Sequence, residues 1–490
     1  MARCDVAVVG AGPAGTAAAV TAVGAGARVV LLDAEARPGG QYWRHGPGGG
    51  AGPGSVEHAA RWRALARRLD SALTTGRLSY HARSRVWRLD PGQSGLGVLL
   101  QVVHEDGGNG VDASARETVE AAAVVLAPGA HDRVLPFPGW DVPGVLTAGA
   151  AQALLKEHGV RAGSRVVVAG TGPFLLPVAA GLAEADVRVL EIDEAGDGRG
   201  WARGWRAAAG APARIADGVR YGALLARHRV PVHLRHAVVA AHGSDRLDGV
   251  TIARIDENWR IVRSTERHVE CDVVAVSWGF TARLDLALQA GCDTEPGPDG
   301  APAVRVDATG RTSVPRVLAA GELTGIVGAE QALLEGAVAG SAAAAVAAGR
   351  EPAAVHHVVD GRRARLTAFA AAMHAAHPVQ NGWTSWLADE TVICRCEEVS
   401  AGDVSAAIDD LGATDARTVK LLTRAGMGWC QGRMCAEAVA RLVATTRRVP
   451  FDPYADLLAG SGRPVAFPVP LAAVAAAGLA ADDSSSGGSS

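Results

Sequence analysis

The stretch "CDVAVVGAGPAGTAAAVTAVGAGARVVLLD", residues 4–33, decides the fold of this chain. Cys4–Val9 is apolar with little alternation, which predicts a strand buried on both faces. The Ala-rich run Pro13–Val23 predicts a helix, and Val29–Leu32 predicts a second buried strand. Strand, tight turn, helix and strand in this order predict a βαβ unit, the building block of a parallel sheet.

The turn of this unit carries a G-x-G-x-x-G pattern with a carboxylate 23 positions after its first glycine. Gly10 permits the tight turn, and Gly12 lets the backbone approach a pyrophosphate at the helix N-terminus. Gly15 allows close packing of helix and strand, and Asp33 can accept hydrogen bonds from ribose hydroxyls. A bare glycine pattern is weak evidence, but its context here predicts a dinucleotide site. The expected contacts are Gly10, Gly12, Pro13, Ala14, Gly15 and Asp33.

Three further motifs decide between FAD and NAD at this site. "RPGGQYW" (37–43) follows the acid directly, and "LAAGE" (318–322) precedes a helix rich in small residues. With "VVLAPGA" (124–130), this combination resembles the two-dinucleotide flavoprotein superfamily, which includes glutathione and thioredoxin reductases. The resemblance implies an α/β fold and FAD, with Glu322 near the ribityl chain where Asp is usual, and Pro128 where Thr is usual. It adds these FAD contacts: Gly40, Gln41, Ala127, Gly129, Gly321 and Glu322.

The same unit recurs 160 positions later as "SRVVVAGTGPFLLPVAAGLAEADVRVLEID", residues 164–193. Gly170 and Gly172 match the first two glycines, Asp193 is aligned with Asp33, and Leu175 stands at the third glycine position. The duplication predicts a second module of related build. A bulky Leu175 is expected to push helix and strand apart. The module then either binds a nucleotide loosely or is a scaffold. If it binds one, Asp193 and Glu191 would repel a 2′-phosphate and favour NAD over NADP.

Four late cysteines form two close pairs, Cys394-x-Cys396 and Cys430-x4-Cys435. Four thiolates can hold Zn²⁺ or an iron–sulfur cluster. Because a C-x-C pair fits a zinc knuckle poorly, the spacing favours a [2Fe–2S] cluster with one close pair on each metal. Arg395 and Arg433 add positive charge beside the cluster, and zinc remains the alternative.

Composition excludes several classes of protein. The 490 residues carry a formal charge of −3, from 48 basic and 51 acidic side chains, which gives no electrostatic case for nucleic acid. There is no signal-peptide pattern and no apolar segment of the ~18–20 residues that span a bilayer. Cytoplasmic location is therefore expected. Seven cysteines make no disulfide scaffold, and residues 1–390 hold no C-x-x-C or C-x4-C pair, which disfavours a disulfide reductase. His374 and His377 are expected at a polar helix end rather than on a metal.

"CRCEEV…GMGWCQGRMC" resembles the [2Fe–2S] domain of bacterioferritin-associated ferredoxin. The motifs "PGGQYWR", "GAHDRVLPFPGW", "GTGPFLLPVAAGL", "SWGFTAR", "GELTGI" and "CQGRMC" resemble those of the α (large flavoprotein) subunit of hetero-oligomeric amine dehydrogenases. This family includes opine oxidases, D-hydroxyproline dehydrogenases, hydrogen cyanide synthase and, more distantly, dye-linked proline dehydrogenase and sarcosine oxidase. The match covers about residues 3–446.

That resemblance implies an FAD-dependent oxidoreductase subunit for CH–NH or CH–NH2 donors. It implies a β subunit of the amino-acid-oxidase type with its own flavin, a small ferredoxin-like subunit in some members, and an interfacial FMN as a further cofactor. The α chain would relay electrons from the partner to an external acceptor, so no catalytic residue is assigned here. Two alternatives stay open: an NADH-dependent flavin/[2Fe–2S] reductase, and a non-catalytic scaffold with structural zinc.

The expected organisation joins two dinucleotide-binding domains to a small α-rich cluster domain. Its segments are a discontinuous FAD-binding domain at 1–144 and 282–350, an NAD-like domain at 145–281, a connector at 351–390, a [2Fe–2S] domain at 391–446 and a C-terminal extension at 447–490. The terminal "ADDSSSGGSS" is expected to be disordered because it holds almost no apolar residue.

Overall fold

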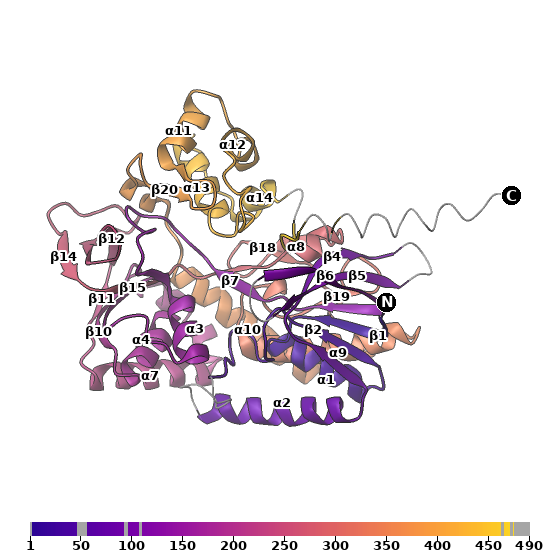
Figure 1. Ribbon diagram of the computed structural model, residues 1–490. Helices are drawn as coiled ribbons and strands as arrows, with labels where there is room; N and C mark the ends of the chain where they lie inside the picture. Colours follow the sequence, from indigo (N-terminus) through magenta and orange to yellow (C-terminus); the bar gives the residue numbers. More distant parts are fainter. Residues whose placement is uncertain are drawn as a thin grey trace.

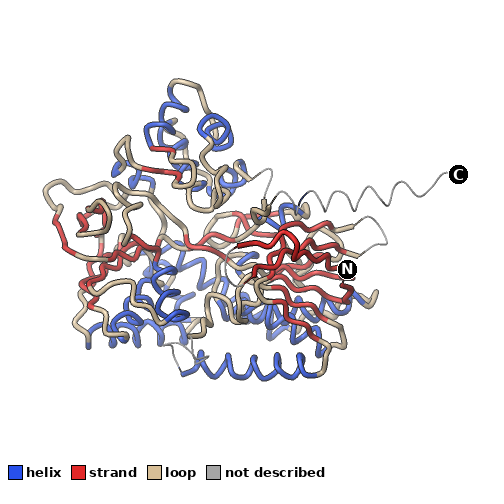
Figure 2. Tube along the Cα trace, in the orientation of Figure 1, coloured by secondary structure: helices blue, strands red, loops and turns tan. Residues whose placement is uncertain are grey.

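The computed structural model describes residues 2–46, 56–92, 97–106, 110–461, 465–470 and 474. Two α/β lobes lie side by side, and a small helical unit sits above them (Figure 1). The secondary structure shows strands at the centre of each lobe and helices around them (Figure 2). The tail that the sequence predicts to be disordered lies outside the described residues.

The first lobe is built on a seven-stranded sheet in the order β3-β2-β1-β6-β5-β4, with β19 also paired to β6. Its strands β1, β2, β3 and β19 are parallel to the carboxyl half of β6, whereas β4 and β5 form an antiparallel meander. The strands are β1 (Ala2–Val9), β2 (Val29–Leu32), β3 (Leu78–His81), β4 (Ser84–Asp90), β5 (Val98–Asp106), β6 (Gly110–Leu126) and β19 (Val317–Ala319).

Two small-residue helices pack closely on one face of this sheet. They are α1 (Pro13–Gly24) and α9 (Ala329–Ala347), with α2 (Val56–Thr74) beside them. A Cβ on Gly336 would lie 2.0 Å from the Ala14 carbonyl oxygen, and one on Gly340 would lie 2.2 Å from that of Ala18. Only glycine permits these approaches, so the two glycines of α9 set the spacing between the helices.

The second lobe holds a five-stranded parallel sheet in the order β11-β10-β9-β15-β8. Its strands are β8 (Val145–Thr147), β9 (Arg165–Gly170), β10 (Arg188–Glu194), β11 (Val232–Leu234) and β15 (Val273–Ser277). The helices are α3 (Ala148–His158), α4 (Leu175–Glu184), α5 (Gly200–Arg203), α6 (Trp205–Ala209) and α7 (Pro212–Arg227). The second lobe also contains a three-stranded antiparallel sheet. Its strands are β12 (His236–His242), β13 (Gly249–Arg254) and β14 (Arg267–Glu270).

Two short antiparallel strands cross between the lobes. β7 (Ala130–Asp132) leaves the first lobe, and β16 (Phe280–Ala282) returns to it, with His131 opposite Thr281. The chain then forms α8 (Asp285–Gln289), the hairpin of β17 (Thr294–Pro296) and β18 (Pro302–Val304), and β19. The first lobe is therefore discontinuous in sequence.

The connector contains a 20-residue helix, α10 (His357–Ala376), followed by a 3-10 segment, η2 (Asn381–Trp386). α10 runs between the two lobes (Figure 1). A Cβ on Gly200 would lie 2.4 Å from Ala376 Cα, and one on Gly204 would lie 2.6 Å from Ala372 Cβ. These glycines let α5 and α6 pack tightly on the end of α10.

The cluster unit packs around helix α13 at the top of Figure 1. It consists of β20 (Val392–Cys394), β21 (Val399–Ser400), α11 (Ala401–Asp409), α12 (Ala416–Thr423), α13 (Ala436–Thr446) and α14 (Pro453–Ala459). No helix within the described ranges is both long enough and apolar enough to cross a membrane.

Candidate functional site

The first fingerprint forms a cradle that side chains would fill. Gly10 has a φ of +99°, and a Cβ there would lie 2.2 Å from the Ala127 carbonyl oxygen. A Cβ on Gly15 would lie 1.7 Å from the Gly10 carbonyl oxygen. Gly12 faces open space at the start of α1, whose first helical residue is Pro13. The backbone of this turn can thus approach a pyrophosphate, as the sequence predicts.

Asp33 closes the cradle from the end of β2. Its Oδ2 accepts a hydrogen bond of 2.5 Å from the Ala11 amide, and its Oδ1 accepts one of 2.8 Å from the Glu35 amide. Burial raises the pKa of Asp33 to about 6, against the lowering effect of these two amide donors. The carboxylate therefore holds the loop in shape. Its predicted contact with a ribose stays a prediction.

The other predicted FAD residues lie around the same loop. Gly40 has a φ of +59°, and a Cβ there would lie 2.7 Å from Gly12 Cα, so the "PGGQYW" segment covers the fingerprint. Gln41, next along this segment, is exposed. The Ala127 amide donates to the Val9 carbonyl at 2.9 Å, and Gly129 has a φ of +75° where the chain turns toward β7.

The last flavin motif is held by an acid that sequence reasoning missed. Glu335, buried in α9, accepts hydrogen bonds of 2.9 Å from the Gly321 amide and the Thr324 hydroxyl. Glu322 accepts one of 2.8 Å from the Gly328 amide, and burial raises the pKa of Glu322 to about 7. Glu335 belongs to none of the motifs that the sequence presents. Its position on the buried face of a small-residue helix is the signal that could have revealed it.

The second fingerprint differs from the first in two features: the residue at which its helix begins and the carboxylate that holds its loop. Gly170 repeats the close approach, since a Cβ there would lie 1.9 Å from the Ser277 carbonyl oxygen. Helix α4 begins only at Leu175, after a turn, and Leu175 is buried in the apolar core of the module. Leu175 is thus accommodated by a later helix start rather than by separation of helix and strand.

A bulge in β10 corrects the alignment of the second acid by one residue. The register shifts between Val189 and Glu191, so that Gly170 pairs with Glu194 rather than with Asp193. Glu194 accepts hydrogen bonds from the Thr171 hydroxyl at 2.7 Å and the Gly172 amide at 2.9 Å. The structural counterpart of Asp33 is therefore Glu194. NAD binding at this module stays a prediction.

Asp193 points into the protein instead. Its side chain is fully buried, neither oxygen has a hydrogen-bond partner among the described residues, and Arg267 lies 3.6 Å away. Burial, followed by the charge of Glu191, raises the pKa of Asp193 to about 8. Burial thus favours the protonated form of Asp193, whereas Glu191 is paired with Arg267.

The two connector histidines lie at the end of α10 and contact both lobes. His374 Nε2 lies 2.8 Å from the Ile326 carbonyl oxygen, next to the last flavin motif. His377 Nδ1 lies 3.5 Å from Glu194, and its Nε2 accepts a hydrogen bond of 3.0 Å from Trp201 Nε1. The end of α10 therefore links the first lobe to the second fingerprint.

The four predicted metal ligands come together at one end of the cluster unit. Cys394 and Cys435 are buried, Cys430 is half-buried and Cys396 is exposed. The Cys435 thiol and the backbone amides of residues 426, 397 and 396 lower the pKa of Cys394 to about 5. The same contact raises the pKa of Cys435. Sulfurs this close, surrounded by amide donors, are the donor set that an iron–sulfur cluster requires.

The closest sulfur contacts run across the two motifs. The Cys394 thiol lies beside that of Cys435, and the Cys396 thiol lies beside that of Cys430. Which cysteines share an iron stays a prediction. Among the described residues, no three of these sulfurs lie within 4.8 Å of one another. A single tetrahedral Zn²⁺ would bring all four to about 3.8 Å, given Zn–S bonds of ~2.3 Å. The arrangement in two pairs fits a two-iron cluster better than zinc.

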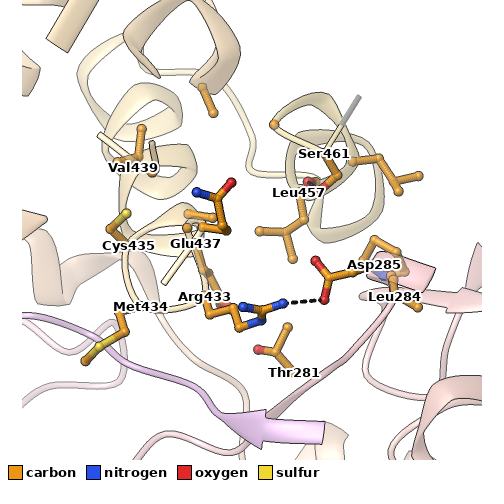
Figure 3. Close-up of a pocket in the computed structure, with 18 of the residues that line it drawn as sticks. Thr281, Leu284, Asp285, Arg433, Met434, Cys435, Glu437, Val439, Leu457 and Ser461 are labelled. Carbon is orange, nitrogen blue, oxygen red and sulfur yellow. Dashed lines mark hydrogen bonds and ion pairs between the residues drawn. The ribbon is translucent and has the colours of Figure 1, made fainter. Parts of the chain in front are cut away.

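Arginines near the cluster dock it onto the lobes. Arg433 Nη2 donates to Asp285 of α8 at 2.9 Å, so the cluster loop touches the first lobe (Figure 3). Arg395 Nη2 donates to the Asp141 carbonyl at 3.1 Å, and its guanidinium lies over the Trp140 ring at 4.8 Å. These two charges, expected beside the cluster, are thus engaged in contacts between domains.

A buried carboxylate adds a third anchor that the sequence did not reveal. Glu437, in the first turn of α13, lies 2.8 Å from Arg133 Nε just after β7 and 2.9 Å from Arg441. Burial disfavours its charge, but the two guanidinium groups hold the pKa of Glu437 below its usual value. Arg133 also lies 3.2 Å from Asp299. The ion pair between Glu437 and Arg133 therefore joins the cluster unit to the segment that follows β7.

A cavity of about 150 Å³ lies where these parts meet. Arg433 and Cys435 come from the cluster loop, Thr281 from the crossing strand β16, Asp285 from α8 and Leu457 from α14 (Figure 3). The cavity separates the cluster loop from the strands that cross between the lobes. The interfacial FMN that the family resemblance implies stays a prediction.

Two family models together match most of the chain. Residues 4–351 match the family of pyridine nucleotide-disulphide oxidoreductases, and residues 392–445 match the BFD-like [2Fe–2S] binding domain. The chain therefore belongs to the pyridine nucleotide-disulphide oxidoreductase family and carries a BFD-like domain. It is a flavin-dependent oxidoreductase with FAD and a [2Fe–2S] cluster as cofactors.

Within that class, the chain is similar to two known enzyme subunits over most of its length. It is 34% identical to hydrogen cyanide synthase subunit HcnB of Pseudomonas aeruginosa, over 87% of this chain and 90% of the relative. It is 33% identical to an opine oxidase subunit of Agrobacterium tumefaciens, over 91% of this chain and 86% of the relative. The chain is a member of this group, as the motifs predicted.

The fold has a close counterpart among solved structures. L-proline dehydrogenase from P. horikoshii superposes with a TM-score of 0.63 at 20% identity, covering 92% of this chain and 75% of that one. The predicted fold class, a two-dinucleotide-domain flavoprotein with a [2Fe–2S] domain, is confirmed.

Proposed function

We propose that this chain is the electron-relay subunit of a hetero-oligomeric dehydrogenase for an amino or imino acid. A partner flavoprotein of the amino-acid-oxidase type would oxidise the C–N bond, and this chain would pass the electrons to an external acceptor. The substrate class spans opine-, hydroxyproline-, proline-, sarcosine- and glycine-like compounds. The similarity to subunits of an opine oxidase and of a hydrogen cyanide synthase supports this assignment.

The docking of the cluster loop is the observation that carries the proposal. Arg433, two residues before Cys435, is hydrogen-bonded to Asp285 in the lobe that bears the FAD fingerprint. Exposed Cys396 and Trp429, which is 70% exposed, leave the other side of the cluster open to solvent. An electron carrier needs one side toward its internal donor and one toward an external protein, and this arrangement supplies both.

The residues of this chain bind and orient cofactors rather than a substrate. When bound, FAD supplies two-electron chemistry and the cluster supplies one-electron chemistry. The cysteines of the two lobes, Cys4, Cys271 and Cys292, are all buried, and burial raises the pKa of each thiol. Buried, protonated and unpaired thiols do not reduce disulfides, which argues against the disulfide chemistry in the family name.

Co-expression with the partner flavoprotein tests the proposal. The expected result is stoichiometric co-purification, with amino-acid-dependent reduction of an external dye only when both chains are present. Full-rate amino-acid dehydrogenation by the isolated chain would refute the division of labour. Bleaching of the flavin absorbance by NADH under anaerobic conditions, without a partner or an amino acid, would favour the NADH-dependent reductase instead.

A further inference from the structure

Two histidines and a glutamate converge on three strands of the first sheet, and none of them belongs to the glycine fingerprint or to the four cysteines. His81 ends β3, His104 lies in β5 and Glu117 lies in β6. His81 Nδ1 lies 3.1 Å from Glu117 Oε2, and His104 Nε2 lies 3.3 Å from the same oxygen. One ligand atom from each residue lies within 4.8 Å of the others. The function proposed above uses none of these side chains.

The spacing of these atoms suits a first-row divalent cation. Metal–ligand bonds of ~2.0–2.1 Å place neighbouring ligands of a tetrahedral site about 3.3 Å apart. The two nitrogen–oxygen distances, 3.1 and 3.3 Å, agree with that separation. Two imidazoles and one carboxylate are a recurring ligand set for Zn²⁺. The three side chains are 21–30% exposed, so a water molecule can complete the coordination.

The hydrogen bonds around His104 fix the orientation of its lone pair. The Ser84 hydroxyl donates to the Ala82 carbonyl at 2.9 Å, and Ser84 Oγ lies 2.9 Å from His104 Nδ1. Because the hydroxyl proton is engaged, Ser84 Oγ accepts the Nδ1–H of His104, and Nε2 is left with a lone pair. A metal-ligating histidine is usually held by such a hydrogen bond from its other nitrogen.

The backbone also presents His104 toward this point. The ladder between β5 and β6 shifts register between Val103 and Glu105, so His104 lies at a bulge. Bulges redirect side chains and are frequent beside functional sites. The lone pair of His104 Nε2 then faces Glu117 Oε2 at 3.3 Å. Because both atoms are acceptors, a cation must lie between them. That cation is either a proton on the imidazole or a metal ion.

We propose that His81, His104 and Glu117 form a binding site for a divalent first-row transition metal, with Zn²⁺ as the probe. The bound ion would link β3 to β5 and β6, two strands with which β3 is not paired in the sheet order. Its ligands are nitrogen and oxygen atoms, so it is chemically distinct from the four-thiolate site. A simple histidine–carboxylate ion pair, without metal, is the outcome that would overturn the proposal.

Zinc binding to the full chain with its cofactors in place tests the site. Equilibrium dialysis against Zn²⁺, with zinc and iron counted separately, should find one zinc per chain while the iron content stays constant. Glu117→Gln keeps the size of the side chain and should weaken zinc binding at least tenfold. Ser84→Ala removes only the support of His104 and should weaken it about 10–100-fold. Retained FAD and iron in each variant show that the chain is folded.

A second histidine pair of this chain provides the control. The rings of His242 and His268 lie 5.4 Å apart, and His242 Nε2 faces the Thr251 hydroxyl at 2.7 Å rather than a carboxylate. His268→Ala should leave the bound zinc unchanged. Cobalt in place of zinc should lack the intense sulfur-to-metal absorption of a thiolate site. Equal zinc binding by the wild type and Glu117→Gln, or loss of the zinc in His268→Ala, would overturn the proposal.

Discussion

Replacing Glu437 with glutamine tests how the cluster unit is held on the lobes. The Glu437 side chain is 9% exposed and lies between the guanidinium groups of Arg133 and Arg441. Glutamine keeps the shape of the side chain and removes its charge. Arg441, which is 6% exposed, would then keep the neutral Asn381 Oδ1 at 2.6 Å as its oxygen partner among the described residues.

The magnitude follows from leaving a buried charge without its counter-ion. Removing one partner of a buried ion pair costs about 3–5 kcal/mol. An exposed pair is worth only about 0.2–1 kcal/mol. Arg305, whose side chain is 56% exposed and paired with Asp293, provides the matched control. Glu437→Gln should therefore weaken the docking of the cluster unit, whereas Arg305→Ala should change it little.

Urea titration separates the two variants. The visible absorbance of the cluster reports the cluster unit, and flavin fluorescence reports the first lobe. With a cost of about 3–5 kcal/mol and slopes of ~1–3 kcal/mol per M urea, Glu437→Gln should lower the midpoint of cluster bleaching by roughly 1–5 M. A shift no larger than that of Arg305→Ala would refute the reasoning.

The effect of Glu437 should also depend on pH. Its folded-state pKa is depressed, so its contribution to stability is present above the unfolded pKa of a glutamate and is lost as the pH falls through the folded value. The difference between wild type and Glu437→Gln should therefore shrink in acid. An equal difference at neutral and strongly acidic pH would contradict the role of the charge.

Three further substitutions probe the flavin lobe, the second module and the cluster. Gly336→Ala puts a Cβ 2.0 Å from the Ala14 oxygen and should lower the FAD content. Gly361→Ala in α10 has open space around the new Cβ and should leave the FAD content unchanged. Equal FAD content in both variants would contradict this prediction. Burial raises the pKa of Asp193 to about 8 in the folded chain, against about 4 in the unfolded chain. Its contribution to the free energy of unfolding is therefore full below about pH 4. That contribution decreases by on the order of 5 kcal/mol as the pH rises to 8. Asp193→Asn should remove that slope in denaturation midpoints measured at pH 5 and 8, and an unchanged slope would contradict it. Cys394→Ser should abolish iron and sulfide yet retain FAD, as measured by iron analysis and flavin absorbance, and loss of both would contradict separate sites.

Much of the flavin lobe could be predicted because hydrophobic patterning and glycine spacing within short segments determine its strands, turns and helices. The strand, turn and helix at residues 4–33 appear as β1, α1 and β2, with helix α1 starting at Pro13. Glycine patterns report backbone approach directly, since only glycine fits where a Cβ would lie within about 2 Å of another chain segment. The four cysteines were likewise visible because thiolates at short spacings have few other uses outside a disulfide scaffold.

What the sequence did not reveal depends on long-range geometry. The sequence alignment places Asp193 opposite Asp33, whereas the structure places Glu194 there. The cause is a one-residue bulge in β10, which the amino-acid sequence does not indicate. The pairing of Cys394 with Cys435 depends on how β20 meets the loop before α13, more than thirty residues later. Glu437 belongs to none of the sequence motifs, and its partner Arg133 is about 300 positions away.

The position of α10 gives the second module a structural role that does not require a nucleotide. Its carboxyl end packs on Gly200 and Gly204, and His377 contacts Glu194, the acid that holds the second fingerprint. From there the chain enters the cluster unit at Val392, whose carbonyl accepts a 2.6 Å hydrogen bond from Trp140 Nε1. The second module thus supports the start of this segment, and Trp140, just before β8, holds its end. We expect these contacts to hold the cluster at a constant position relative to the flavin lobe.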